Sequence, residues 1–184
     1  MAALLLFSSS AFAAAYQRTD LTFVDPIQDN LGGNHPYLGI DLEPSANLSN
    51  ANLFNANLTD ANLTDANLAS AILFDTNLVD ADLAGANLGG ANLGGANLSG
   101  ANLTGVTLIF ATLFGADLTG ATLVSASGLG QTFGNASTLY DVNTIFTGTF
   151  FDPVAAGWTL VPVPEPGTAI LMGLGLAWLA AERR

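Results

Sequence analysis

A strict five-residue periodicity from Ala46 to Ser125 limits what this chain can fold into. The stretch holds sixteen consecutive units without an insertion, and the middle residue of every unit is leucine. A period of five fits neither the repeat of an amphipathic helix, at about 3.6 residues, nor the alternation of an ordinary strand, at about two. The pattern therefore predicts a stacked array, in which each unit buries its apolar side against its neighbours.

The other positions of each unit are nearly as regular as the leucine. Alanine lies two residues before the leucine in fourteen units, and asparagine lies between them in ten. We expect leucine and alanine to point inward and asparagine outward, with turns at the fifth position, where Gly, Asn and Asp predominate and tolerate tight backbone conformations. The expected core leucines are Leu48, Leu53, Leu58, Leu63, Leu68, Leu73, Leu78, Leu83, Leu88, Leu93, Leu98, Leu103, Leu108, Leu113, Leu118 and Leu123.

Written as Ala-Asn/Asp-Leu and two variable residues, the array resembles the pentapeptide repeat family. The resemblance implies an all-β fold, a right-handed quadrilateral β-helix in which each unit forms one side. Four units would make one coil, so the sixteen units of residues 46–125 would make about four coils. An open solenoid end needs a cover. We therefore expect an N-terminal cap or linker at 16–45, with a candidate strand at 21–24, and a C-terminal cap at 126–161, where the leucine column reaches Gly128.

The two ends of the chain carry candidate export signals. Residues 1–15 are apolar and end in Ala11-Phe12-Ala13, which predicts a signal peptide for signal peptidase. No Lys or Arg precedes this run, so either the start lies further upstream or the signal is weak. The alternative is a partly buried N-terminal segment.

The C-terminal residues 162–184 resemble the PEP-CTERM sorting domain. Pro164, Glu165 and Pro166 precede an apolar run at 167–181, and Arg183 and Arg184 follow it. The resemblance implies an exosortase in the inner membrane of a Gram-negative bacterium, cleavage near the Pro-Glu-Pro motif and a frequent association with exopolysaccharide. The apolar run would cross the membrane as a transient helix, with the arginines as a cytoplasmic stop. A permanent single-span anchor is the alternative.

Composition argues against an enzyme. The chain has no cysteine and no lysine, and its single histidine, His35, lies in a Gly/Pro-rich stretch, so we expect no catalytic, cofactor or metal site. Asp60 and Asp80 would stack one coil apart, where a solvated corner is the plainer interpretation than a weak divalent-ion site. The net charge of −12 disfavours nucleic acid and anionic membranes as partners.

These features favour a secreted or cell-surface structural or interaction protein, with extracellular polysaccharide or a surface protein as its candidate partner. The alternative is an acidic rod that mimics DNA and binds a topoisomerase, which the family resemblance suggests. Asp117 is the only acid between residues 83 and 125, so half of such a rod would lack the charge. Phe54, Phe74 and Phe114 fall on one face of the expected coils, with Gly94 between the last two. They form either an aromatic binding strip or a cover for the rod.

Overall fold

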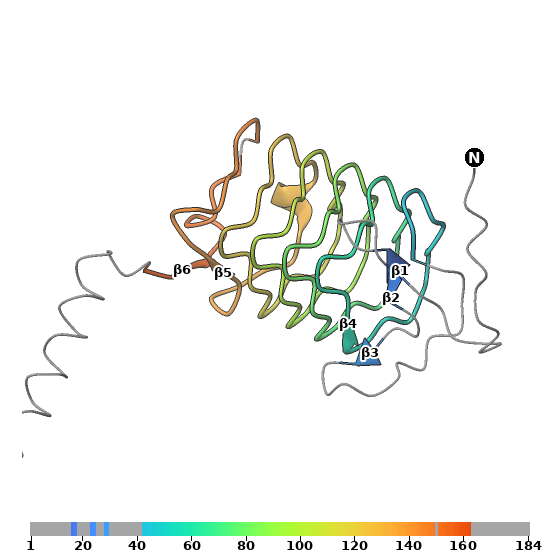
Figure 1. The fold of residues 1–184 in the computed structure, drawn as a ribbon. Helices are drawn as coiled ribbons and strands as arrows, with labels where there is room; N and C mark the ends of the chain where they lie inside the picture. The colour runs from blue at the N-terminus through green and yellow to red at the C-terminus, as the bar shows by residue number, and fades with distance from the viewer. Residues whose placement is uncertain (1–15, 18–22, 25–27, 30–41, 150, 163–184) are drawn as a thin grey trace, which may run out of the picture.

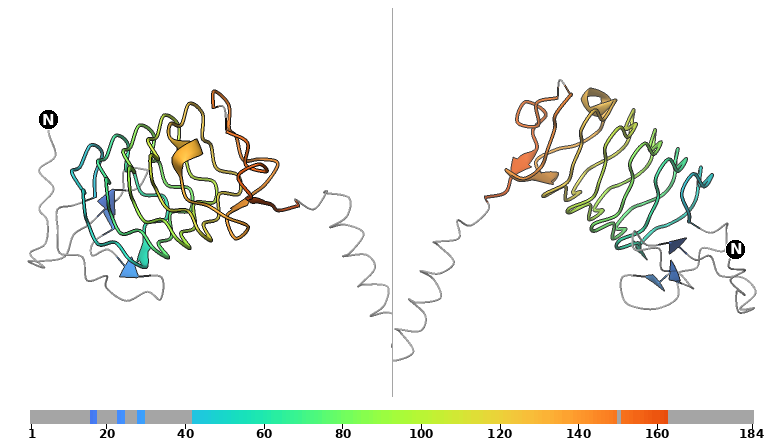
Figure 2. Two further views of the ribbon diagram at one scale, coloured as in Figure 1. Left: turned by 180° about the vertical axis from the view of Figure 1, so that it is seen from behind. Right: turned by 45° about the horizontal axis from the view of Figure 1, so that its top comes forward.

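The fold is a rod of stacked coils, in which each coil has four sides (Figure 1). The computed structural model describes residues 16–17, 23–24, 28–29, 42–149 and 151–162. Both views in Figure 2 show the coils stacked side by side, with β1 to β4 near one end and β5 and β6 at the other.

Parallel bridges between successive coils fix the coil length. Asn47 pairs with Asn67, and Asn67 pairs with Asn87, so that the partners lie twenty residues apart. The Leu48 N–H donates to the Asn67 carbonyl at 2.7 Å, while the Asn67 N–H donates to the Ala46 carbonyl at 2.9 Å. Each unit therefore adds one short rung to a parallel ladder on its own side of the rod.

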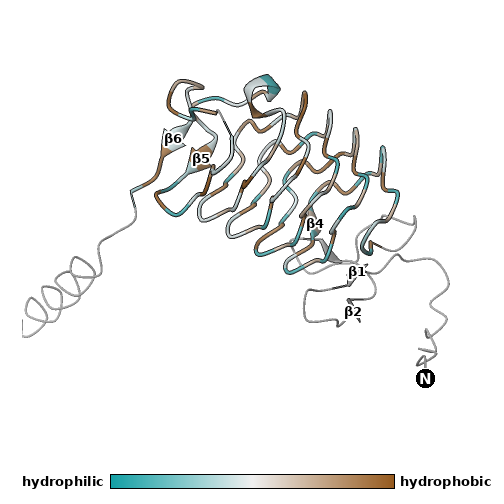
Figure 3. Ribbon diagram, turned by 90° about the horizontal axis from the view of Figure 1, so that it is seen from above, coloured by the Kyte–Doolittle hydropathy of each residue, from teal (hydrophilic) through white to brown (hydrophobic). Residues whose placement is uncertain are grey.

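The axis of the rod is filled by leucine and alanine. All sixteen leucines of the array are at most 1 % exposed, and every alanine in the position two before them is buried. Thr76, which replaces one of these alanines, is also fully buried, and its hydroxyl donates to the Leu53 carbonyl at 2.7 Å. Polar residues alternate with these apolar ones along every coil (Figure 3).

Each corner is a β-turn that ends a unit. The Ala51 N–H donates to the Leu48 carbonyl at 3.0 Å, and Asn50 at the third turn position has a φ of 59°. A positive φ at this position is the feature of type II turns and favours Gly or Asn. The same conformation recurs at every fifth residue to Ser125, including Phe110 with a φ of 59°, which is unusual for a bulky side chain.

The asparagine before each leucine stabilises the same turn. The Asn97 side-chain oxygen accepts the Ser99 N–H at 3.0 Å and the Ser99 hydroxyl at 2.6 Å. Asp82 makes the equivalent contact with the Ala84 N–H at 3.0 Å. A short acceptor side chain at this position is the Asx-type contact that explains why Asn and Asp predominate there.

Parallel stacking continues beyond Ser125, where the leucine period ends. Ser127 still pairs with Thr107, twenty residues away. Phe133, Leu139 and Ile145 then pair with Thr112, Asp117 and Thr122, at separations of 21, 22 and 23 residues. Each of these three sides therefore contains one extra residue, so parallel stacking continues after the five-residue period has ended.

The N-terminal part approaches the first coil through a short strand. β1 (Tyr16–Gln17) pairs antiparallel with β2 (Phe23–Val24), and β3 (Gln28–Asp29) pairs antiparallel with β4 (Ala56–Asn57). Since Asn57 also pairs with Asn77, β3 lies on the N-terminal edge of the first coil. The corner conformation begins at Ser45, one residue before the periodic array.

Aromatic side chains fill the C-terminal end. β5 (Leu139–Tyr140) pairs parallel with β6 (Thr159–Leu160), and a 3-10 helix, η1 (Leu129–Gln131), lies earlier in the last full coil. The rings of Tyr140, Phe146, Phe151 and Trp158 contact one another, with Phe151 and Trp158 4.7 Å apart between centroids. Within the described ranges, no helix combines the length and apolar character needed to cross a bilayer.

Candidate functional site

One side of the rod carries a row of exposed apolar side chains, which we call the aromatic face. Phe54 and Phe74 stack with centroids 6.0 Å apart and an interplanar angle of 12°. The ring of Phe74 extends over the next coil, because a Cβ on Gly94 would lie 2.9 Å from its Cδ2 atom. The members of the aromatic face are Phe54, Ile72, Phe74, Phe114 and Phe133, each between 40 and 51 % exposed.

The coil register explains how these residues meet. Phe54, Phe74 and Phe114 occupy the position after the leucine on the same side of the first, second and fourth coils. Ile72 and Phe133 occupy the outward position that asparagine usually fills. Gly94 leaves space for the Phe74 ring, so the gap in the phenylalanine row is covered. The sequence predicted the three phenylalanines on one face, but not the contributions of Ile72 and Phe133.

A polar groove borders this face across one corner. It has a volume of about 280 Å³ and is lined by Asn57, Asp75, Thr76, Asn77, Gly95 and Asn97. On other sides, stacked side chains bond between coils: the Asn67 amide donates to Asn47 at 3.2 Å, and the Asn102 amide donates to Asp82 at 3.0 Å. The amides of Asn57, Asn77 and Asn97 therefore lie across one corner from the stacked rings of the aromatic face.

Acidic corners concentrate in the first two coils. Asp65, Asp75 and Asp80 each lie against a glycine of the following coil. A Cβ atom placed on Gly85, Gly95 or Gly100 would clash with the carboxylate oxygen of the aspartate beside it. Asp80 does stand one coil above Asp60, as the register predicts. Among the described residues, however, no group of three His, Cys, Asp or Glu side chains is placed to hold a metal ion.

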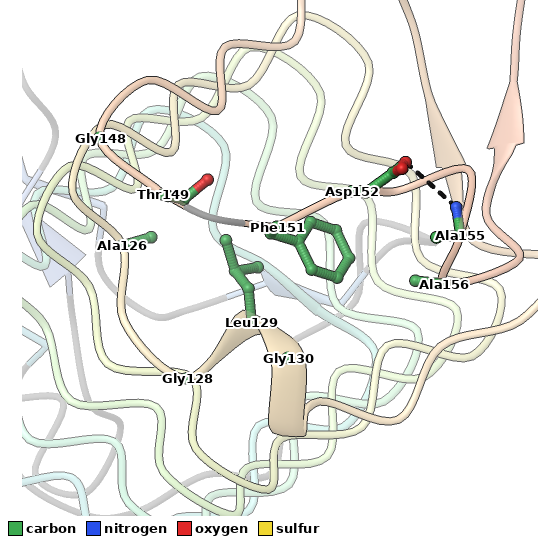
Figure 4. A pocket seen from close by; sticks show the side chains of 10 residues that line it. All are labelled: Ala126, Gly128, Leu129, Gly130, Gly148, Thr149, Phe151, Asp152, Ala155 and Ala156. Carbon is green, nitrogen blue, oxygen red and sulfur yellow. Dashed lines mark hydrogen bonds between the residues drawn. The ribbon is translucent and has the colours of Figure 1, made fainter.

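A hollow of about 580 Å³ opens at the C-terminal end of the rod, between the last full coil and the segment that follows it (Figure 4). The Leu129 and Phe151 side chains point into it, and Asp152 lies at its rim, where its carboxylate accepts the Ala155 N–H at 3.1 Å. The remaining lining is Ala126, Gly128, Gly130, Gly148, Thr149, Ala155 and Ala156. This lining offers shape but no set of groups for catalysis.

Asp141 ends the ladder on one side of the last coil. In earlier coils a corner N–H donates to a carbonyl of the next coil, as Gly100 does to Thr119 at 2.9 Å. The Gly120 N–H instead donates to the Asp141 carboxylate at 2.9 Å, which also accepts the Asn143 and Thr144 N–H groups at 3.0 Å each. The Asp141 carboxylate therefore takes the place of the backbone carbonyl that accepts the corner N–H in earlier coils. The extra residue on this side of the last coil moves that carbonyl out of position.

The electrostatics of Asp141 follow from these contacts. Burial alone raises the pKa of the Asp141 carboxyl. The hydrogen bonds from Gly120, Thr144 and Asn143 together lower this pKa by more than burial raises it, so the pKa lies below its usual 3.8. A carboxylate held by several donors is stabilised in its charged form. Sequence analysis missed this residue, although Asp141-Val142-Asn143-Thr144 is a recognisable turn sequence.

Several predicted site residues lie outside the described residues. These are the signal peptide at 1–15, His35, the Pro164-Glu165-Pro166 motif, the apolar run at 167–181 and the pair Arg183 and Arg184. The predicted core leucines lie in the described coils and line the axis.

Comparison with known families tests the periodic array and the tail separately. The family model for pentapeptide repeats matches residues 46–83 and 81–120. Residues 46–120 are therefore pentapeptide repeats. A second model, for the PEP-CTERM protein-sorting motif, matches residues 162–184 of this pentapeptide repeat protein. Both resemblances inferred from the sequence are therefore confirmed.

Solved structures of other pentapeptide repeat proteins resemble this one. Rfr23 from the cyanobacterium Cyanothece 51142 is 40 % identical over 52 % of this chain and 63 % of its own length, with a TM-score of 0.50. The alr5209 protein from Nostoc PCC 7120 is 34 % identical over 54 % of this chain and 84 % of its own, with a TM-score of 0.34. This pentapeptide repeat protein thus spans just under two thirds of Rfr23. No curated protein matches it.

Proposed function

We propose that this pentapeptide repeat protein is an exported, non-catalytic rod that acts as a structural or interaction protein at the surface of a Gram-negative bacterium. The observation that carries the proposal is the joining of a rigid β-helix to a PEP-CTERM motif at 162–184. The rod supplies long ordered faces, and among the described residues no group of three His, Cys, Asp or Glu side chains is placed to hold a metal ion. In this proposal the tail at 162–184 directs the export of the rod.

The tail supports processing by an exosortase. Pro164-Glu165-Pro166 lies just before the apolar run at 167–181, and Arg183 and Arg184 end the sequence. Fifteen residues give a helix of about 22 Å, which is short for a hydrocarbon core of about 30 Å. Such a segment suits a transient stop better than a permanent anchor, and two arginines favour a cytoplasmic end.

The proposal is tested by expressing the full chain with and without an exosortase in a Gram-negative host. We expect surface or extracellular material whose C-terminus, measured by mass spectrometry, lies near residues 164–166. A matched variant, Glu165→Ala, should retain the whole tail and stay in the inner membrane. Intact protein in the cytoplasm in the presence of the enzyme would refute the proposal.

The aromatic face suggests extracellular polysaccharide as the partner of the exported rod. Phe54 and Phe74 form an ordered stack, and the groove across the corner presents Asn57, Asn77 and Asn97 beside it. Sugar rings combine apolar faces with hydroxyl groups, so rings beside amides suit them. A glycan-binding screen should lose its signals in the double variant Phe54→Ala/Phe74→Ala, but not in Phe110→Ala, a control whose ring is also exposed.

The DNA-mimic alternative makes a different prediction. A topoisomerase-binding rod needs acids along its length, whereas Asp65, Asp75, Asp80 and Asp82 lie in the first two coils. A gyrase supercoiling assay with excess rod should therefore show no inhibition. Inhibition that disappears in an Asp75→Asn/Asp80→Asn variant would favour the alternative over the surface protein.

A further inference from the structure

We propose that the C-terminal end of the rod is a membrane-facing surface, which rests end-on against the phospholipid bilayer while the tail is inserted. We call it the apposition surface and define it by Val142, Ile145, Val154 and Leu160. This inference rests on the proposed function, because it requires the apolar run at 167–181 to enter the membrane.

The covalent connection limits how far this end can lie from the bilayer. The Val161 N–H donates to the Tyr140 carbonyl at 2.7 Å, so the chain is fixed to the rod at that point. Gly167, where the apolar run begins, follows six residues later. Six residues span at most about 20 Å even when fully extended. The first coil lies four further coil spacings away, or roughly 19 Å along the axis.

The side chains at this end suit contact with lipid. Val142 and Val154 are 73 and 69 % exposed, the highest values among the exposed large hydrophobic residues described. Leu160, at 51 %, lies in β6, and Ile145, at 44 %, occupies the outward position on one side of the last described coil. All four come from the segment that forms the end with β5 and β6 in Figure 1. Exposed apolar groups at one end of a rod are candidates for an interaction surface.

Rigid turns present the two valines. Val142 follows Asp141, whose carboxylate is bonded to three backbone N–H groups, and Val154 lies in a turn in which the Asp152 carboxylate accepts its N–H at 2.9 Å. The Trp158 N–H donates to the Pro153 carbonyl at 2.9 Å and closes this second turn. The valines are therefore held outward by structure rather than left on loose loops.

The distribution of acidic residues along the rod also favours its C-terminal end as the one that faces the membrane. Between residues 42 and 82 there are six acids, whereas the described residues after 82 contain only Asp117, Asp141 and Asp152. Asp141 is 8 % exposed, which leaves Asp152 as the exposed acid of the last turns. Anionic headgroups repel acidic surfaces. A bilayer containing phosphatidylglycerol should therefore repel the first two coils and tolerate the last, which favours the end-on orientation over a rod lying on its aromatic face.

Single-cysteine fluorescence tests the orientation, since the natural chain has no cysteine. The full chain is inserted into vesicles of phosphatidylethanolamine and phosphatidylglycerol that contain a nitroxide-labelled lipid as quencher. Bimane is attached at Val154→Cys or Val142→Cys on the apposition surface. For comparison it is attached at Ser49→Cys or Phe54→Cys in the first coil. We expect strong quenching at 154 and 142 and none at 49 and 54.

A charge variant tests the chemistry of the contact. In a Leu160→Cys background, Val142→Asp/Val154→Asp should abolish the quenching of bimane at position 160. The matched control, Ser49→Asp/Phe54→Asp, adds the same two charges at the far end and should leave quenching unchanged. Circular dichroism should show that both variants retain the fold, because Val142, Val154 and Phe54 are exposed and Ser49 lies outside the buried core.

Each outcome decides between the proposals. Vesicle flotation without quenching at 154 would overturn the apposition surface while leaving tail insertion intact. Equal quenching at 54 and 154 would show a rod lying flat and would also overturn it. Failure of the full chain to float with the vesicles would overturn the membrane step of the proposed function, and the apposition surface with it.

Discussion

Replacing Asp141 should loosen the last coil without unfolding the rest of the rod. In Asp141→Ala the half-buried Gly120 N–H loses the acceptor that it has among the described residues, which costs about 1–3 kcal/mol where water does not replace it. The turn also loses its Asx contact with Asn143, worth about 0.5–2 kcal/mol by analogy with helix caps. Since the Thr144 N–H keeps a bond to the Asp141 carbonyl at 3.1 Å, we expect a total of about 2–4 kcal/mol.

Asp141→Asn is the matched control for this change. It keeps one oxygen that can accept the same N–H groups and loses only the charge, so it should cost about 1 kcal/mol. The two variants therefore separate the role of the acceptor from the role of the charge.

Trp158 can report the change directly. It is 6 % exposed in the last turns, and replacing Trp178 by Phe leaves it as the single indole. Urea titration followed by its emission should show Asp141→Ala loosening first, while circular dichroism of the coils changes later, because neighbouring coils of a solenoid unfold separately. Identical urea midpoints for the Ala and Asn variants would refute the argument that the acceptor matters most.

Acid should remove the advantage of the charged carboxylate. The folded pKa of Asp141 is below its usual 3.8, so ionisation stabilises the fold at pH values above this and the contribution disappears as the pH falls through the folded pKa. We expect the wild type to exceed Asp141→Asn in stability at pH 7 and the difference to vanish in strong acid. A stability difference that grows on acidification would contradict the lowered pKa of Asp141.

Three further changes test the coils themselves. Leu88→Ala, at a fully buried position, should lower the unfolding free energy by about 2–5 kcal/mol in urea titration, whereas Thr104→Ala, at a half-buried position outside the core, should not. Gly95→Ala should cost about 1–2 kcal/mol, because its φ is 65° and its new Cβ would meet Asp75, and adding Asp75→Ala should recover the steric part as measured by thermal unfolding. Thr76→Ala should change stability by about 1 kcal/mol or less, since the Leu53 carbonyl still accepts the Ala56 N–H at 3.1 Å.

The regular coils could be predicted because each position of the repeat has one physical role. Leucine fills the axis of the rod, and alanine occupies the second buried position, where a small side chain fits. Asparagine accepts the N–H of the turn, as Asn97 does for Ser99. These roles depend on local spacing alone. A strict period therefore determines which residues are buried and which are exposed, and it places Phe54 and Phe74 on one face.

The last coil could not be predicted from the same pattern, because its spacing changes from five to six. Thr132, Thr138 and Thr144 recur every six residues in the alanine position. The Thr138 and Thr144 hydroxyls donate to the Leu113 and Leu118 carbonyls at 2.7 and 2.9 Å, as Thr76 does to Leu53. A search for leucine finds Gly128 and then loses the register. A search for the threonine period would have found the continuation.

The change of period also explains why the rod has two different ends. A five-residue unit closes its ladder with carbonyls of the next coil, so it can be extended without limit. A six-residue unit displaces such a carbonyl, as at Gly120, where the Asp141 side chain must take its place. The extra residue itself is free to project, and Val142 occupies that position. The same insertion that stops the growth of the array therefore creates the exposed apolar tip at Val142, in the part of the chain that leads toward the sorting tail.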